Sequence, residues 1–208
     1  MTNTGDIIIQ EKPVNVSWDD IKDCLHVAHL DNYNKGIVMQ HQGLTGDEIK
    51  ELLGNEGQMF VALSNDRVVG TAAIKPKETS FWFGRSLFAY FCFAGIIPEY
   101  KGEGLYKCFN VKREKYAQSL GIDKLMFNTH PRNKRVIDVA LRSGYKLVRY
   151  SKFDIFSYVY LVKWLNGCPY SDYRCRYEYL KSKYIALTKY YIKRIIGKIG
   201  ISIKREKP

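Results

Sequence analysis

Apolar residues recur at helical spacing in the first quarter of the chain, after a short apolar run, Ile7–Ile9, that predicts a strand. Two helices are expected here. Each begins with a Ser or Thr that is followed three residues later by an acidic residue, which is the pattern of a capping box. The pairs are Ser17 with Asp20, and Thr45 with Glu48. The first helix should end near Leu30 and the second at Gly54.

After Gly54 the apolar period changes to two, which predicts strands. Met59–Leu63 and Val68–Ile74 should form a hairpin around a short polar turn. The segment Ser86–Ile97 is apolar on both faces and should therefore be the buried central strand. Gly95 within it is a candidate β-bulge, where strand pairing is interrupted.

The helical period returns at Leu105 and ends at Gly121. Beyond it we expect a strand at Lys124–Thr129, a helix at Asn133–Ser143, and strands at Tyr145–Tyr150 and Phe153–Leu165. The elements predict an α/β protein with a mixed sheet of about six or seven strands flanked by helices.

Residues 167–208 carry a separate pattern, a long basic amphipathic helix. Its apolar stripe recurs at heptad-like spacing: Tyr177, Leu180, Tyr184, Leu187 and Tyr191. Of the formal charge of +12, residues 174–208 hold 11 Lys and Arg against 2 acidic residues, a net +9. Such a helix can pack on the sheet or on a second subunit as a homodimer, or lie on an anionic membrane surface; nucleic acid is the less favoured partner.

Composition limits the remaining choices. Hydrophobic residues make up 46% of the chain, enough for a sizeable core. The five cysteines include no C-x-x-C pair, which favours reduced, buried thiols over disulfides or a zinc framework. The polar start of the sequence predicts no signal peptide, and no apolar run reaches the ~18 residues of a membrane span, so a cytoplasmic protein is expected.

Candidate chemistry centres on residues 94–106, where an apolar strand leads through a glycine-bearing turn into a helix. Glycines permit a tight turn, and the first N–H groups of the helix have no intrahelical acceptor. Those donors converge where the helix dipole is positive, which favours a phosphate or pyrophosphate. His26 and His29 have a spacing that could hold a metal, but without a third ligand nearby they are interpreted as surface or packing histidines, and no metal site is expected.

The element order and two sequence blocks resemble the GNAT superfamily of N-acetyltransferases. The text Ile96-x-Pro98-x-Tyr100-Lys101-Gly102-x-Gly104-Leu105 is similar to the coenzyme A pyrophosphate loop of that family, and Asn133 with Ala140–Tyr145 resembles its second block. The resemblance implies a GNAT domain over residues 1–166, followed by the basic helical extension at 167–208.

The resemblance also implies acetyl-CoA as cofactor and assigns its contacts. The backbone of Lys101, Gly102, Glu103, Gly104, Leu105 and Tyr106 would bind the pyrophosphate. Backbone groups near Gly95, Ile96 and Ile97 would pair with the pantetheine arm, and an N–H there would polarise the thioester carbonyl. Asn133 would bind the pantetheine, serve as a helix N-cap, or do both, and a neighbouring Arg or Lys could reach the 3′-phosphate.

Two departures from the family pattern bear on catalysis. Tyr106 replaces the usual small residue of the loop, and Ala140 stands where many members carry a tyrosine that acts as general acid. His130 is then the best-placed acid or base, although a positioning role or plain exposure is the alternative. Tyr145 is either a core aromatic or a displaced proton donor.

The expected function is transfer of an acetyl group from acetyl-CoA to a primary amine of a small molecule, an amino sugar or a protein, by direct attack. The alternative is a CoA-binding or membrane-surface module on the same scaffold with weak or no catalysis. The resemblance places the acceptor pocket in residues 31–42 and in a loop at 75–85, where the aromatic side chains of Phe81, Trp82 and Phe83 can form a wall.

Overall fold

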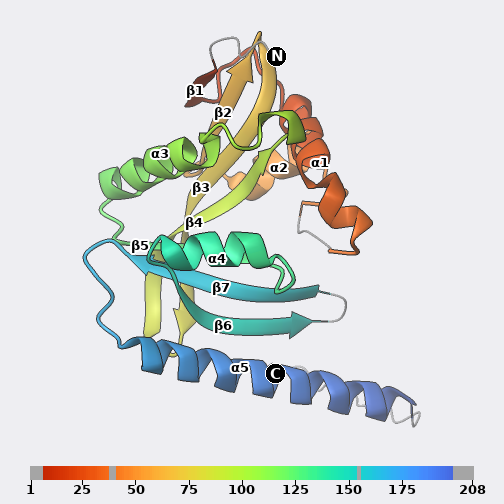
Figure 1. Cartoon of the computed structure of the whole chain (residues 1–208), viewed down its shortest axis with the longest axis vertical. Helices are drawn as coiled ribbons and strands as arrows, with labels where there is room; N and C mark the ends of the chain where they lie inside the picture. The colour runs from red at the N-terminus through yellow and green to blue at the C-terminus, as the bar shows by residue number, and fades with distance from the viewer. Residues whose placement is uncertain (1–6, 38–40, 154–155, 199–208) are drawn as a thin grey trace. The chain divides into compact units, whose positions relative to one another are not determined.

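The structure is a computed structural model that describes residues 7–37, 41–153 and 156–198, with side chains up to residue 195. Seven strands form one mixed sheet in the order β1-β2-β3-β4-β5-β7-β6, flanked by helices (Figure 1). The elements are β1 Ile8–Glu11, α1 Trp18–Asn34, α2 Gly46–Leu53, β2 Gln58–Ser64, β3 Arg67–Phe81, β4 Gly84–Ile96, a 3-10 turn Pro98–Tyr100, α3 Leu105–Ser119, β5 Lys124–Thr129, α4 Lys134–Arg142, β6 Lys146–Phe153, β7 Phe156–Trp164 and α5 Asp172–Lys198.

The chain divides into two compact units. The first unit comprises Met1–Phe127 and Val162–Cys168, and the second comprises Asn128–Leu161 and Pro169–Pro208. The first therefore holds β1 to β4 with helices α1, α2 and α3, and the second holds α4, β6 and α5.

Both predicted capping boxes are present. The hydroxyl of Ser17 accepts from the N–H of Asp20 at 3.0 Å, and that of Thr45 accepts from the N–H of Glu48 at 3.2 Å. Helix α1 continues beyond the predicted end near Leu30 to Asn34. No glycine or proline interrupts it before Gly36, so the helical backbone continues although the apolar pattern fades.

Strands β3 and β4 form one long antiparallel hairpin, with pairs running from Gly70–Ile96 to Phe81–Gly84. The prediction that residues 75–85 form a loop was wrong, because Lys75 to Phe81 are paired along β4. Aromatic contacts hold the far end of the hairpin together: the ring centroids of Phe81 and Phe83 are 5.4 Å apart, and Phe83 also contacts Trp164. Residues 75–81 mix polar and aromatic side chains, so they lack the apolar alternation that predicts a strand. Their strand conformation is fixed by pairing with β4.

A β-bulge lies in β4, two residues before the predicted position. Pairing shifts register between Thr71 and Ala73, where Phe93 and Ala94 together oppose one residue of β3. Phe93 has φ 45°, a left-handed conformation that is rare outside glycine. Gly95 itself pairs with Thr71.

Gly95 is explained by packing rather than by the bulge. A Cβ on Gly95 would lie 2.8 Å from the Cβ of Ala28 on α1, whereas a Cβ on Gly70 would meet Phe109 of α3 at 3.1 Å. Gly70 and Gly95 occupy successive cross-strand pairs and so face opposite sides of the sheet. Helices α1 and α3 therefore cover opposite faces of β3 and β4, as Figure 1 shows.

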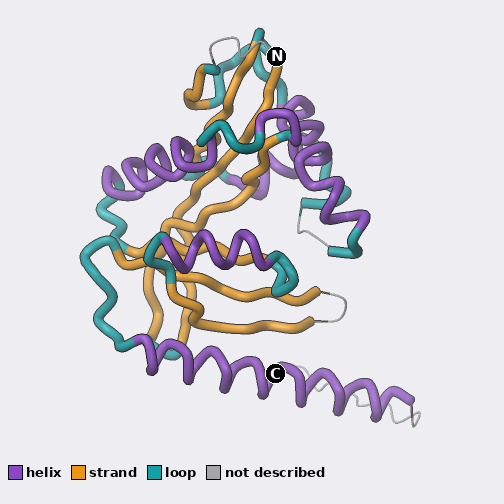
Figure 2. The backbone as a smooth tube through the Cα atoms, in the orientation of Figure 1, coloured by secondary structure: helices purple, strands orange, loops and turns teal. Residues whose placement is uncertain are grey.

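In the second unit, α5 runs along β6 (Figure 2). The N–H of Tyr150 donates to Ser182 Oγ at 2.9 Å, and Lys146 forms a salt bridge with Asp172 at 2.5 Å. Cys175 and Glu178 are buried on the packed side. The outer side exposes large apolar residues: Tyr173, Tyr177, Leu180, Tyr184, Tyr191 and Ile195.

The five cysteines are free thiols, as predicted, but only Cys24 and Cys175 are buried, whereas Cys108 is exposed. Among the helices of the described residues, none has the length and apolar character needed to cross a membrane.

Candidate functional site

The loop that leads from β4 into α3 is shaped by two glycines. Gly102 has φ 106° and Gly104 has φ 74°, conformations in which a side chain would be strained. Apart from its two chain neighbours, no residue has a heavy atom within 4 Å of the position that a Cβ would take on Gly102 or Gly104. The loop from Lys101 to Gly104 is exposed, so a ligand could approach its backbone closely.

Helix α3 begins with unpaired donors. Its first hydrogen bonds join the N–H groups of Lys107 and Cys108 to the carbonyl of Gly104, at 3.0 and 3.2 Å. Within the described part of the chain, the N–H groups of Leu105 and Tyr106 have no such acceptor. No acidic residue lies in the first turn of α3, so the positive end of the helix dipole is not neutralised there. This arrangement is suited to an anion with several acceptor oxygens.

The side chains of the loop leave its donors accessible. The ring of Tyr106 lies 5.9 Å from the guanidinium of Arg113 further along the same helix. Leu105 is buried and anchors the helix start. The ammonium of Lys101 lies 3.5 Å from the carbonyl oxygen of Ala28, so this cation contacts α1. Glu103 is exposed.

The last residues of β4 extend beyond its pairs with β5. The pairing of β4 with β5 is parallel and joins Ala89 with Leu125 and Tyr90 with Met126. In the described first unit, β4 runs on to Ile96 beyond these pairs. The N–H of Ile97 donates to Val69 at 3.0 Å. Since N–H groups alternate along a strand, the N–H of Ile96 points away from β3.

His29, which the sequence analysis interpreted as a packing or surface histidine, bonds to the β-bulge of β4. His29 Nε2 donates to the carbonyl of Ala94 at 2.9 Å, and its Nδ1 accepts from Asn32 at 3.1 Å. Burial lowers the pKa of His29, so the neutral ring is favoured. The carbonyl of Phe93 accepts from the hydroxyl of Thr71 at 2.9 Å, so both bulge carbonyls have side-chain partners.

His41 lies beside His29, with ring centroids 4.7 Å apart. Its Nε2 is buried with no hydrogen-bond partner among the described residues. Burial, with a smaller contribution from His29, lowers the pKa of His41 to about 3. The two neutral imidazoles therefore form a partly buried pair, one of them on α1.

In the second unit, His130 and Asn133 share the turn between β5 and α4. The Nδ1 of His130 accepts the N–H of Arg132 at 3.1 Å, so Nε2 carries the proton of the neutral ring. Burial lowers the pKa of His130, and the charges of Arg132 and Lys152 lower it further. The side-chain amide of Asn133 donates to Thr129 Oγ1 at 3.2 Å. Asn133 stands at the N-cap position of α4 but makes no side-chain cap hydrogen bond.

Tyr145 and Ala140 are both buried at the end of α4. The N–H of Tyr145 donates to the carbonyl of Ala140 at 3.0 Å and closes the helix, with Gly144 at φ 88° between them. A methyl group at residue 140 cannot donate a proton. The sequence contained no signal for the roles of His29 or Phe93, because their partners lie far away along the chain; the contact of His29 with Ala94 spans 65 residues.

The sequence matches the acetyltransferase (GNAT) family over residues 23–145. No curated protein matches it. Among solved structures the chain is similar to an acetyltransferase from Streptococcus agalactiae, with 20% identity and a TM-score of 0.60 over 76% of this chain and 98% of that one. It is similar to an N-acetyltransferase from Staphylococcus aureus, with 14% identity and a TM-score of 0.57 over 78% and 100%. A third, a GNAT-family acetyltransferase from Elizabethkingia anophelis with acetyl-CoA bound, shares 11% identity and a TM-score of 0.55 over 76% and 98%. At these identities the likeness shows the shared fold.

Proposed function

Because the chain belongs to the GNAT family of acetyltransferases, we propose that it transfers the acetyl group of acetyl-CoA to a primary amine. The acceptor would be a small molecule, an amino sugar or a protein amine. The observation that carries the proposal is the glycine loop before α3, where Gly102 and Gly104 have positive φ and the first N–H groups of the helix are unpaired.

The residues present fit acetyl-CoA. The loop from Lys101 to Tyr106 would hold the pyrophosphate, because the N–H donors of its later residues and the helix dipole converge there. The N–H of Lys101 is bonded to Pro98, so Lys101 would act through its charge. The outward N–H of Ile96 would pair with the pantetheine arm as an added strand does. Ile97 would act indirectly: its N–H is bonded to Val69 and its side chain is buried, so it fixes the end of the strand that presents Ile96. Asn133 would supply an amide to the same arm. When bound, the cofactor supplies a thioester whose acetyl group is open to attack by an amine.

To accept the proton that an ammonium acceptor must lose before it attacks, the neutral ring of His130 would release the N–H of Arg132 and use Nδ1, because Nε2 carries the ring proton. The pKa of His130 is lowered by burial and by Arg132 and Lys152, so the ring is neutral at neutral pH and can act as a base. Tyr145 would donate the proton to the leaving thiolate in place of the tyrosine that Ala140 replaces. An oxyanion donor from the β4 backbone would stabilise the charge that develops on the carbonyl oxygen.

Acetyl-CoA binding and amine-dependent turnover test the loop directly. Gly102→Val and Gly104→Val should each weaken acetyl-CoA binding, measured by calorimetry, by at least about tenfold, because a branched side chain is strained at positive φ and shifts the donors. Turnover against a panel of amines should fall with it. Gly121→Val is the matched control: Gly121 has φ 69° with an open Cβ position, but it ends α3. It should lower stability while acetyl-CoA affinity is retained. Unchanged affinity in both loop variants would contradict the assignment.

A second candidate function rests on Ala140 and on the exposed stripe of α5. The chain would bind CoA with weak or no catalysis and use α5 at a membrane surface or against a second copy as a homodimer. The stripe includes Tyr177, Leu180 and Tyr184, all exposed, and basic residues flank it. CoA binding without turnover on any amine of the panel would favour this candidate over the first.

A further inference from the structure

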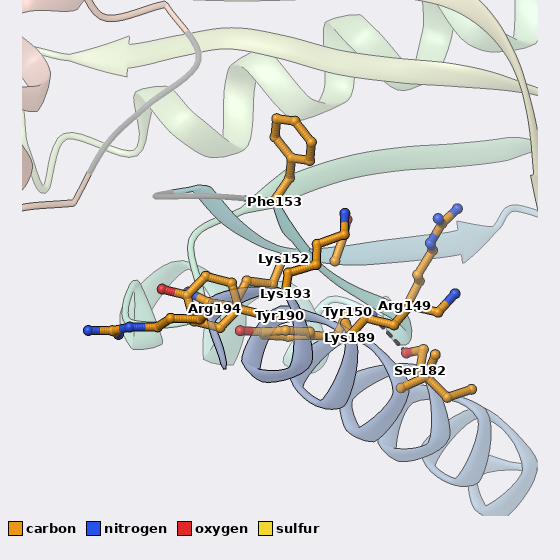
Figure 3. A pocket seen from close by; sticks show the side chains of 12 residues that line it. Arg149, Tyr150, Lys152, Phe153, Ser182, Lys189, Tyr190, Lys193 and Arg194 are labelled. Atoms are coloured by element: carbon orange, nitrogen blue, oxygen red, sulfur yellow. Dashed lines mark hydrogen bonds between the residues drawn. The ribbon is translucent and has the colours of Figure 1, made fainter. Parts of the chain in front are cut away.

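A pocket of about 750 Å³ lies between β6 and α5, entirely within the second unit (Figure 3). It is built from one run of residues on β6 and four turns of α5, so two regular elements form its walls. Its lining residues are Arg149, Tyr150, Ser151, Lys152, Phe153, Ser182, Ile185, Ala186, Lys189, Tyr190, Lys193 and Arg194.

Five of these twelve residues are cationic and none is acidic. Arg149 and Lys152 come from β6, and Lys189, Lys193 and Arg194 come from α5. The described acidic residues of this unit are engaged elsewhere or lie on another helix: Asp172 pairs with Lys146 and Glu178 pairs with Arg174, while Asp138 is on α4. Among the described residues, the positive charge of the pocket is therefore not compensated by carboxylates.

The pocket is also held in shape. The hydrogen bond from the N–H of Tyr150 to Ser182 Oγ, at 2.9 Å, ties α5 to β6 at one end (Figure 3). At the other end the ammonium of Lys152 lies 4.3 Å from the ring centroid of Tyr190 and 3.3 Å from Ser157 Oγ. Lys152 is thus positioned by an aromatic ring and a hydroxyl, neither of which neutralises its charge.

We propose that this pocket binds an organic anion that carries a phosphate group. Like charges gathered in one concave site repel one another, and a dianionic group offsets this repulsion better than a single carboxylate does. The two guanidinium groups have the planar geometry that suits phosphate oxygens, and the lysines add mobile point charges. The volume is that of a site for a nucleotide-sized ligand, and Phe153, Ile185 and Ala186 provide apolar lining for its organic part.

This site differs from the outer face of α5. Ser182, Ala186 and Tyr190 follow one another at four-residue spacing on the side that faces β6, whereas Leu180 and Tyr184 are exposed on the opposite side. The inference also does not rest on acetyl transfer, because none of the twelve residues belongs to the loop or the turn assigned to acetyl-CoA. The phosphate could be presented by a soluble compound or by a lipid headgroup.

Calorimetric titration with inorganic pyrophosphate, at physiological salt, tests the proposal in the full chain carrying Gly104→Val, because the glycine loop of the unaltered chain is itself proposed to hold a pyrophosphate. The pair Lys189→Gln and Lys193→Gln removes two lining charges of α5. The control pair Lys181→Gln and Lys183→Gln removes two exposed charges of the same helix that do not line the pocket. Pyrophosphate should bind this Gly104→Val parent chain saturably. The dissociation constant should rise at least about tenfold in the pocket pair, corresponding to about 1.4 kcal/mol, and less than about threefold in the control pair.

Two further experiments identify the binding site and the source of the phosphate group. Arg149→Gln, on the β6 wall, should weaken pyrophosphate binding while circular dichroism and thermal unfolding stay unchanged. Vesicles of equal parts phosphatidylcholine and phosphatidylserine replace pyrophosphate in a second titration. Binding to vesicles alone, lost selectively in the pocket pair, identifies a lipid headgroup as the phosphate source. Equal losses in both pairs with either probe, or no saturable binding to either, overturn the proposal.

Discussion

At the scale of single residues, the described site depends on backbone conformations and buried imidazoles that no short motif encodes. Gly102 and Gly104 could be assigned to a turn from sequence, because glycine is the residue that tolerates positive φ. Phe93 could not, since a phenylalanine at φ 45° is imposed by strand pairing and by the bond between its carbonyl and Thr71.

If His130 is the catalytic base, its protonation should cause the fall of kcat/KM at low pH, which is the acid limb of the pH–rate profile. Its pKa is lowered from 6.5, so the midpoint of the fall in kcat/KM, where half of the rings have taken up a proton, should lie below pH 6.5. Lys152→Gln removes one of the charges that lower the pKa and should move this limb to higher pH. Lys134→Gln, an exposed lysine of α4, is the control.

His130→Ala should abolish that limb and lower kcat/KM by at least about a hundredfold. The measurement is the pH dependence of initial rates with the preferred amine. An unchanged limb in His130→Ala would assign the base to another group.

His41 should make the first unit sensitive to acid. Its pKa is lowered to about 3 in the folded chain, so below pH 6.5 the unfolded chain binds a proton that the folded chain excludes. Stability is therefore lost as the pH falls from 6.5 toward 3, with a slope of up to about 1.4 kcal/mol per pH unit for one such group.

His41→Gln should flatten this slope, measured by urea unfolding at a series of pH values. His26→Gln, at an exposed position of α1, should leave the slope unchanged. Equal slopes in the wild type and His41→Gln would show that other groups cause the acid sensitivity.

At the scale of elements, helix caps and apolar periodicity predicted most helices and strands. The segments that they missed are fixed by pairing with residues distant in sequence. The bounds of β5 were predicted without error, because its apolar run is short and bounded by turns. The hairpin of β3 and β4 was missed beyond Ile74, since its polar residues are fixed by partners on the neighbouring strand. Gly95 was predicted to form a β-bulge, but it instead permits close contact between α1 and β4.

Close packing of α1 on β4 can be tested at Gly95. A Cβ there would lie 2.8 Å from Ala28 Cβ, so Gly95→Ala should lower the free energy of unfolding by about 1 to 3 kcal/mol. Ala28→Gly opens the space, and the double variant should be more stable than the sum of the two single changes predicts. Strict additivity in this double-mutant cycle, measured by denaturant unfolding, would mean that the contact is not the cause.

At the scale of the whole molecule, the family and the fold class were predicted from sequence, whereas the division into residues 1–166 and 167–208 stays a prediction. The net charge of +12 is concentrated in residues 174–208, at +9. The sequence indicated a basic helix there, but it could not show that α5 and β6 enclose a pocket, because pockets depend on how two elements pack.

Vesicle binding by the intact chain can distinguish the contribution of charge from that of apolar surface. If the outer face of α5 binds anionic membranes, affinity should fall steeply with salt, because the attraction is screened. Leu180→Ser with Tyr184→Ser keeps every charge but removes apolar contact, and should weaken binding to phosphatidylserine vesicles by at least about tenfold. The sedimentation coefficient of the same variant tests the homodimer, since a shift to the monomer would assign the stripe to a second copy.

The bond between His29 and Ala94 has a mechanical consequence. A peptide group is rigid, so a pull on the Ala94 carbonyl also rotates the N–H of Gly95 in the same plane. Helix α1 ends at Asn34, within the segment that the sequence analysis predicted to line the acceptor pocket, and it holds β4 by this bond. Any tilt of α1 when an acceptor arrives would therefore be transmitted, through one imidazole, to the strand edge that is proposed to hold the acyl arm.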